Sequence, residues 1–311
     1  MTDARLRRSV HFVPGANERM LTRSLGLAAD ALVLDLEDAV TPERKSEARA
    51  VVAGWLHDVD FGRQERIVRM NPLETPWGME DLRVTMQAPP DAYLVPKVRD
   101  LADIERIDRT LTQLESEFGH VSGGVKLILV ATETPLGVLN LPTFTRCKRV
   151  AALSWGAEDL SAAIGARRNR DEDGNYLDVF KFCRIQTLLC ATAGNVQPLD
   201  TVYVDIKNLA GLRRDCQEGA WMGFTGKITI HPDQVPIVNE MFTPSPDEVA
   251  EARELVDAFE QAQREGRMAF SFRGQMVDVP HLSRARTIIE RARQATSRAL
   301  DGQNNPICLG E

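Results

Sequence analysis

Residues 125–137 read VKLILVATETPLG, and this stretch decides the fold. Its opening residues are almost all apolar and include β-branched Val and Ile, which is typical of a strand buried on both faces of a parallel sheet. Pro135 then prevents the strand from continuing. The stretch therefore predicts a buried strand that delivers the carboxylate of Glu133 at its carboxyl end.

A second segment, residues 150–160 (VAALSWGAEDL), has the same organisation. An apolar strand runs into Gly156, and Asp159 follows shortly after it. Strand ends of this kind carry the chemistry of α/β barrels. The sequence has no paired-cysteine or paired-histidine metal motif, so we interpret Glu133 and Asp159 as oxygen ligands of a hard divalent cation, Mg²⁺ with Mn²⁺ as the alternative. The competing interpretation is a pair of solvated loop acids.

Apolar strands alternate with amphipathic helices along most of the chain, which predicts a (β/α)8 TIM barrel over residues 1–243. Residues 244–311 depart from this alternation. They contain a charged helix at 248–265, a turn at Arg273-Gly274 and a second helix at 281–300, which predicts a C-terminal helical extension. The strands of the barrel are expected at residues 9–14, 31–36, 65–71, 92–97, 125–131, 150–155, 201–206 and 226–230.

The composition excludes several classes of protein. The chain has 311 residues, of which 43% are hydrophobic, and a net charge of −7, so a large core is expected and a general nucleic-acid-binding surface is not. The five cysteines are scattered and fit reduced thiols. The beginning of the sequence has no apolar signal core, and no apolar run reaches membrane-spanning length, so we expect a cytoplasmic protein with no membrane partner.

Further charged residues are predicted near the same strand ends. Glu37 and Asp38, with Asp35, would accept hydrogen bonds from metal-bound water, or would form an acidic cluster at a helix start. Arg69 interrupts an apolar strand, which is costly unless the guanidinium is paired. It would clamp a substrate carboxylate, or form an ion pair with an acid at the preceding strand end. Lys97 would hold an anionic group or pair with a neighbouring acid.

His231 and two arginines of a polar stretch each have two interpretations. His231, after the last expected strand, would be a catalytic base or a hydrogen-bonding loop residue. Arg168 and Arg170 lie in the long polar stretch ARRNRDEDGN and would meet phosphates or stay solvated. The sequence contains no GxGxxG, P-loop, GxSxG or HExxH motif.

Eight ordered runs, spread from about residue 8 to residue 293, resemble the citrate lyase β-subunit/malyl-CoA (citramalyl-CoA) lyase family of metal-dependent barrel aldolases. They are SVHFVPGANERM, ALVLDLEDAVTPERKSEAR, VRMNP, LVPKV, ATETPLGV, SWGAEDLSAAIGA, GFTGKITIHPDQVPIVNEMFTPS and GQMVDVPHLSRA. The chain departs from the usual family pattern at Arg23, where lysine is common, and at Asn208, where an acid is common.

The resemblance implies specific roles for several residues. Mg²⁺ would lie on Glu133 and Asp159, and Arg69 would bind the substrate carboxylate. Lys97 is a candidate substrate contact because of its own position at a strand end. Asp278, in the extension, would be the general acid and would reach into the site of a neighbouring subunit. The family resemblance also implies a homo-oligomer, a trimer or a hexamer, in which the extension packs on a neighbour.

The expected activity is therefore reversible cleavage of a 3-hydroxyacyl-CoA thioester of the malyl-CoA or citramalyl-CoA type into acetyl-CoA and a 2-oxo acid. One alternative is a citrate lyase β-subunit that acts on a citryl thioester with partner subunits. A second is a CoA-free 2-oxo acid aldolase, whose base is more often a histidine. A third is an acyl-CoA-binding protein without catalysis.

Overall fold

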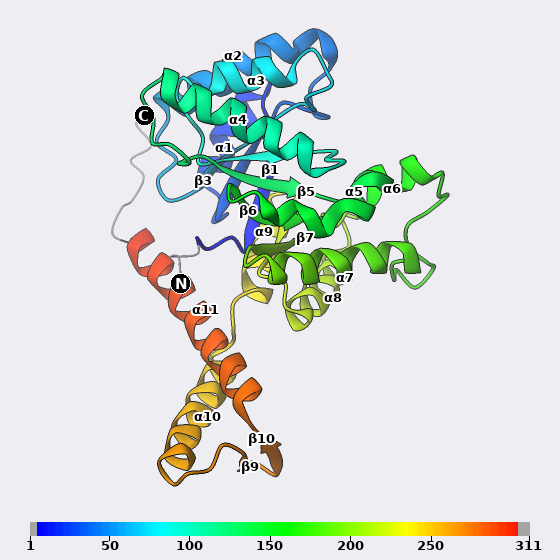
Figure 1. Cartoon of the computed structure of the whole chain (residues 1–311). Coiled ribbons are helices and arrows are strands. Elements are labelled where there is room, and N and C mark those ends of the chain that lie inside the picture. The colour runs from blue at the N-terminus through cyan, green and yellow to red at the C-terminus, as the bar shows by residue number, and fades with distance from the viewer. Residues whose placement is uncertain (1–4, 304–311) are drawn as a thin grey trace. The chain divides into compact units, whose positions relative to one another are not determined.

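Eight strands pair in parallel and in sequence order until the last closes on the first, which produces the barrel in Figure 1. The computed structural model describes residues 5–303. Closure occurs where Val10 of the first strand lies beside Ile228 of the last. The strands are β1 (Ser9–Pro14), β2 (Ala31–Asp35), β3 (Glu65–Arg69), β4 (Ala92–Val95), β5 (Lys126–Val130), β6 (Val150–Ser154), β7 (Gln197–Asp200) and β8 (Gly226–Thr229).

Alternate residues of these strands face opposite sides of the barrel wall, because side chains alternate along a strand. One buried cluster fills the interior and contains Val10, Val33, Ile67 and Ile128. The barrel is therefore a packed core whose wall orients the residues at each strand end.

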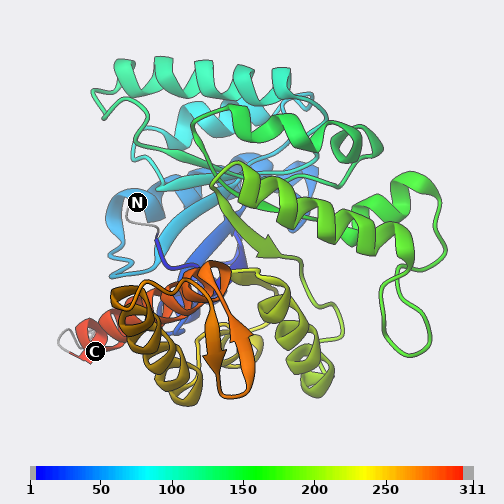
Figure 2. The same ribbon diagram turned by 60° about the horizontal axis from the view of Figure 1, so that its bottom comes forward.

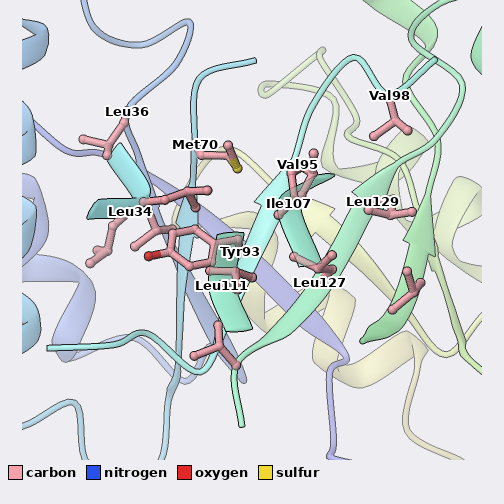
Figure 3. Close-up of a cluster of buried hydrophobic side chains, with 14 of the residues drawn as sticks. Leu34, Leu36, Met70, Tyr93, Val95, Val98, Ile107, Leu111, Leu127 and Leu129 are labelled. Carbon is pink, nitrogen blue, oxygen red and sulfur yellow. The ribbon is translucent and has the colours of Figure 1, made fainter. Parts of the chain in front are cut away.

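A second buried cluster lies between the strands and the helices around them. It explains why helix α4 (Leu101–Glu117) forms where it does. The Asp100 side chain caps its first turn by accepting from Asp103 N, and Ile104, Ile107 and Leu111 face the strands at helical spacing. Figure 3 shows Ile107 and Leu111 against side chains of the strands, among them Tyr93 and Leu127.

Helices and helical turns connect successive strands around the outside of the barrel (Figure 1). Besides α4 they are α1 (Glu18–Leu25), η1 (Pro42–Arg44), α2 (Lys45–Asp58), α3 (Gly78–Thr85), α5 (Pro135–Asn140), η2 (Leu141–Arg146), α6 (Ala157–Ile164), α7 (Asp178–Ala193), α8 (Leu209–Met222) and α9 (Gln234–Met241). None of the helices in the described part of the chain is long and apolar enough to cross a membrane.

The chain divides into two compact units, the barrel over Arg7–Asn239 and a second unit that begins at Glu240. In the second unit, α10 (Pro246–Arg264) and α11 (Val279–Gln303) pack side by side, with the hairpin of β9 (Phe270–Phe272) and β10 (Gln275–Val277) between them in the sequence (Figure 2). Ser245 and Glu248 form a capping box at the start of α10. The rings of Phe259 and Phe270 pack edge to face, 5.7 Å apart.

The predicted (β/α)8 barrel with C-terminal helices is confirmed, but two details of the sequence analysis are wrong. The seventh strand is Gln197–Asp200, before the expected segment 201–206. Pro198 argues against a central strand, because proline has no N–H to donate, and this hid the true strand. Helix α6 was not expected, so Asp159 lies in the first turn of a helix and not directly at a strand end.

Candidate active site

Charged side chains gather at the carboxyl ends of β2 to β6, as expected from the pattern of strands and acids. Asp35 is the last residue of β2, and Arg69 is the last residue of β3. Lys97 follows β4, and Glu133 follows β5. Asp159 joins them from the start of α6. Parallel strands that end at one rim bring together residues up to 124 positions apart in the chain, from Asp35 to Asp159.

Glu133 is almost fully buried at this rim, and one of its carboxylate oxygens has a fixed partner. The backbone N–H of Lys97 donates to Glu133 Oε2 at 2.6 Å. Burial, together with the negative charge of Asp159, raises the pKa of Glu133 to about 8. A carboxyl group with this environment gains most from a nearby cation, because the cation would stabilise its ionised form.

Gly156 explains how the Glu133 carboxyl fits. A Cβ at position 156 would lie 2.5 Å from Glu133 Cγ and 3.2 Å from Oε1, so only glycine leaves room for this side chain. The backbone N–H of Gly156 also donates to Thr132 Oγ1 at 3.2 Å, which connects the ends of β5 and β6. Local sequence patterns mark Gly156 only as the end of a strand and carry no signal of this steric role.

Lys97 connects the acids of three strand ends. Its Nζ lies 2.6 Å from Glu37 Oε1, 3.3 Å from Asp38 Oδ1 and 3.4 Å from Asp159 Oδ1. These carboxylates raise its pKa against the opposing effect of burial, so the ammonium stays charged. The backbone of Lys97 has a φ of 54°, in the left-handed region that a lysine rarely adopts. Of the two interpretations in the sequence analysis, the structure contains the pairing with acids.

Arg69 is also held by acids of the neighbouring strand end. Its Nε and Nη2 donate to the two carboxylate oxygens of Asp35 at 2.7 and 2.6 Å. Its Nη1 lies 2.9 Å from Glu37 Oε2, and its guanidinium lies over the Phe12 ring, 4.6 Å from the centroid. The ion pair with acids of the preceding strand end is therefore present, and contact of Arg69 with a substrate carboxylate stays a prediction.

Glu37 and Asp38 differ in their surroundings although they are adjacent. Glu37 is buried, and burial raises its pKa in spite of Arg69 and Lys97. Asp38 is exposed and lies 3.7 Å from Arg69 Nη1. Lys45 stabilises the chain here, because its buried ammonium donates to the carbonyl oxygens of Leu36 and Glu37. No local sequence pattern predicts this contact.

The donor set of this rim suits a divalent cation. Five carboxylates, from Asp35, Glu37, Asp38, Glu133 and Asp159, outnumber the three cationic side chains near them, Arg69, Lys97 and Lys45. Among residues 5–303 there is no group of three or more His, Cys, Asp or Glu arranged around one metal position. Mg²⁺ needs no such group, because it retains several waters and binds through one or two carboxylates. The residues present therefore fit Mg²⁺ held by Glu133 and Asp159.

The remaining candidates have partners of their own. Asp278 belongs to the second unit, between β10 and α11, where its Oδ1 lies 2.6 Å from His281 Nδ1. His231, after β8, lies 3.6 Å from Asp233. Arg170, in the polar loop, forms an ion pair with Asp215 of α8 at 2.9 Å.

Comparison with known proteins identifies the family. The model of the HpcH/HpaI aldolase/citrate lyase family matches residues 8–232. The chain belongs to this family. The resemblance stated from the eight sequence runs is thereby confirmed.

Members of the HpcH/HpaI aldolase/citrate lyase family with known names cover nearly the whole chain. The (3S)-malyl-CoA thioesterase of Cereibacter sphaeroides is 36% identical over 92% of this chain and 94% of its own length. The mitochondrial citramalyl-CoA lyase of Mus musculus is 35% identical over 92% of this chain and 86% of its own length. The structure of protein CitE from Mycobacterium tuberculosis, with magnesium, acetoacetate and coenzyme A, superposes with a TM-score of 0.77 at 30% identity and covers 93% of this chain and 98% of CitE.

Proposed function

We propose that the protein is a Mg²⁺-dependent carbon–carbon lyase that cleaves a 3-hydroxyacyl-CoA thioester of the malyl-CoA or citramalyl-CoA type. The products are acetyl-CoA and a 2-oxo acid, and the reaction is reversible. The observation that carries the proposal is the rim where Glu133 and Asp159 meet Lys97 in an excess of carboxylates. The CoA thioesters in the names of the relatives, and the magnesium and coenzyme A in the CitE structure, support it.

Glu133 and Asp159 would hold the metal ion. A bound Mg²⁺ supplies Lewis-acid stabilisation of the oxyanion that develops as the carbon–carbon bond breaks. Glu133 is suited to this role because its buried carboxyl has a protein partner on Oε2, and that partner is a backbone N–H whose position does not depend on a flexible side chain. Asp159 is the more exposed of the two and faces Lys97.

The other residues orient substrate and move a proton. Arg69 contacts the substrate carboxylate through Nη1, the nitrogen that has an ion-pair contact but no hydrogen bond within residues 5–303. Lys97 adds a second positive charge at the rim. When the bond between the hydroxyl-bearing carbon and its neighbour breaks, the hydroxyl proton passes to water and the hydroxyl oxygen becomes the carbonyl oxygen of the 2-oxo acid. The electron pair of the broken bond passes to the enolate of acetyl-CoA. Asp278 donates the proton that converts this enolate carbon into a methyl group.

We propose that Asp278 acts in a neighbouring subunit of a homo-oligomer, a trimer or a hexamer. Several large apolar side chains on the outer face of α7 support self-association, since apolar stripes of this size are uncommon on the surface of a monomer. Val179, Phe182, Ile185 and Leu189 recur at helical spacing along this face and are between 45% and 63% exposed. A second copy of the chain would cover them.

The test is a panel of thioesters. The purified protein, with Mg²⁺ and again with excess chelator, is incubated with malyl-, methylmalyl-, citramalyl- and citryl-CoA, and the products are identified by mass. We expect acetyl-CoA and the matching 2-oxo acid from a malyl-CoA or citramalyl-CoA substrate, only with metal present. Glu133→Ala and Asp159→Ala should abolish cleavage while the melting temperature stays within a few degrees of the wild type.

Two results would reject the proposal. Normal cleavage by either variant would remove the metal assignment, and no cleavage of any thioester by the wild type would remove the lyase activity. Asp233→Ala serves as a matched control, because the carboxylate of Asp233 is exposed and lies 3.6 Å from the loop residue His231. The substitution should leave the rate unchanged.

One further candidate follows from the 36% identity with a malyl-CoA thioesterase. A thioesterase would release malate and free CoA, whereas a lyase releases acetyl-CoA and glyoxylate. Because the panel identifies both product pairs, free CoA without any 2-oxo acid would favour the thioesterase.

A further inference from the structure

Asp278 and His281 form a close pair in the second unit of the chain. Asp278 Oδ1 lies 2.6 Å from His281 Nδ1, and the backbone N–H of Asp278 donates to the same nitrogen at 3.3 Å. The two residues are one helical turn apart at the start of α11. At 2.6 Å the carboxyl group and the imidazole are hydrogen-bonded, so a proton has a direct path between them. The side chains are 40% and 33% exposed, so the pair is accessible to water.

The position of Asp278 would favour a different arrangement. It precedes the first residue of α11, and its carbonyl oxygen accepts from His281 N at 3.0 Å, as the residue before a helix should. Aspartate at such a position normally accepts a backbone N–H with its side chain. Asp100 does this at the start of α4, where it accepts from Asp103 N at 3.0 Å. Asp278 instead directs its carboxyl group to an imidazole.

The second nitrogen of His281 is open. Within residues 5–303, His281 Nε2 has no hydrogen-bond partner. His281 also lines a cavity of about 250 Å³ between α10, the hairpin and α11. Water in this cavity can exchange protons with the imidazole while Nδ1 stays on Asp278.

From this geometry we propose that His281 is a positioning and proton-relay residue that acts through Asp278. This inference rests on the proposed lyase activity, in which Asp278 is the general acid. In cleavage, the carboxyl proton of Asp278 forms the new C–H bond of acetyl-CoA and leaves a carboxylate. His281 then passes a proton to that carboxylate through Nδ1.

Water completes the proton relay. Water supplies a proton to the imidazole, and exchange with the solvent restores the starting tautomer. One proton therefore passes from water to the methyl carbon in each turnover, and in the condensation direction the same path carries a proton out. Histidine is suited to this because its two ring nitrogens bind and release protons near neutral pH.

Two substitutions separate proton transfer from hydrogen bonding. His281→Asn keeps a hydrogen-bond donor near the position of Nδ1 but cannot take up and release a proton. His281→Ala removes both the donor and the proton transfer. We expect both variants to lower kcat by about 100-fold with KM nearly unchanged, on the order of what general acid–base partners contribute. Added imidazole should restore part of the activity of His281→Ala.

A matched control and a second readout complete the experiment. His57→Ala removes the imidazole of an exposed His–Asp pair with the same 2.6 Å spacing, from Asp58, and should leave kcat unchanged. Without substrate, the nitrogen chemical shifts of the His281 ring should differ between the wild type and Asp278→Asn. This NMR comparison tests the proton-sharing contact without turnover.

The outcomes distinguish this inference from the proposed function. If the wild type cleaves thioesters but His281→Asn keeps full activity, the imidazole only orients Asp278 and the relay is wrong. The absence of imidazole rescue in a folded His281→Ala protein also overturns it. If the wild type cleaves nothing, the proposed function fails first, and the NMR comparison alone decides whether the pair shares a proton.

Discussion

Among single residues, Lys97 has the most consequential surroundings. Its ammonium lies among Glu37, Asp38 and Asp159, in the region where a divalent cation is proposed to bind. The lysine therefore neutralises part of the acidic rim when no metal is bound. Like charges repel at such distances, so the ammonium also opposes a metal ion beside it.

We predict that Lys97→Met destabilises the metal-free protein and tightens metal binding. The loss of the internal cation should lower the free energy of unfolding by about 1 kcal/mol in chelator. Excess Mg²⁺ should reduce this deficit, because the metal takes over the neutralising role. Urea unfolding with and without Mg²⁺, together with calorimetric titration of Mg²⁺, measures both effects.

The control is Lys126→Met, since the exposed Lys126 ammonium donates to the carbonyl oxygen of Gly123 and lies at the opposite end of β5. It should change stability by less than about 0.5 kcal/mol. Equal destabilisation of Lys97→Met with and without Mg²⁺, or weaker metal binding, would show that Lys97 does not compete with the cation.

The buried residue His11 predicts how the stability of the protein depends on pH. It is buried in β1 with Nδ1 3.0 Å from Thr229 Oγ1, and burial, with a smaller contribution from His231, lowers its pKa to about 4. An unfolded histidine has a pKa near 6.5. The unfolded chain therefore binds the proton more readily between these values, so stability falls as the pH falls from about 6.5 to 4.

The difference between the two pKa values corresponds to about 3 kcal/mol at most. His11→Asn removes this titration while it keeps a polar group beside Thr229. The free energy of unfolding of the variant, measured by urea titration from pH 7 to pH 4.5, should therefore fall less than that of the wild type. Parallel curves for the two proteins would contradict the assignment.

Among the elements, the end of β6 fixes the space available at the end of β5. Gly156 has ordinary backbone angles, so the reason for glycine is the Glu133 side chain and not the backbone conformation. Because Glu133 is buried, it cannot move aside at low cost.

Gly156→Ala should therefore displace the Glu133 carboxyl. We predict at least a tenfold loss of Mg²⁺ affinity with the barrel still folded, as measured by calorimetry and circular dichroism. Gly54→Ala is the matched control, because a Cβ at this position in α2 meets nothing within 4 Å. It should raise stability by about 0.5–1 kcal/mol, since glycine is unfavourable inside a helix. Wild-type metal affinity in Gly156→Ala would show that Glu133 is free to move.

The proposed mechanism uses residues of both compact units. Glu133 lies in the barrel, and Asp278 lies in the second unit. If each site takes Asp278 from a neighbour, then Glu133→Ala and Asp278→Ala damage different halves of a shared site. Inactive variants of the two kinds can then complement each other within one oligomer.

We predict that co-expressed Glu133→Ala and Asp278→Ala chains recover a substantial fraction of lyase activity, because some mixed interfaces contain both intact residues. Phe182→Glu, which places a charge on the exposed apolar face of α7, should reduce the oligomer in light scattering and prevent this recovery. The absence of recovery in verified mixed oligomers would place Asp278 in its own subunit's site.

The sequence alone determined the order of strands and helices, because buried strands and amphipathic helices have different periods. It also identified Glu133 as the residue after a buried strand, since Pro135 ends that strand whatever surrounds it. Family-specific runs identified Asp278, which no local pattern would single out. The sequence did not place β7, because Pro198 makes a true strand look like a break.

Tertiary structure decided which charged groups meet. The sequence left open whether Arg69 and Lys97 would be free or paired, and only closure of the barrel brings them against Asp35 and Glu37. It also decided that Gly156 makes room for Glu133 and that Lys97 N–H holds its carboxylate. The physical reason is that periodicity fixes local conformation, whereas ion pairs and side-chain space depend on neighbours that are distant in the chain.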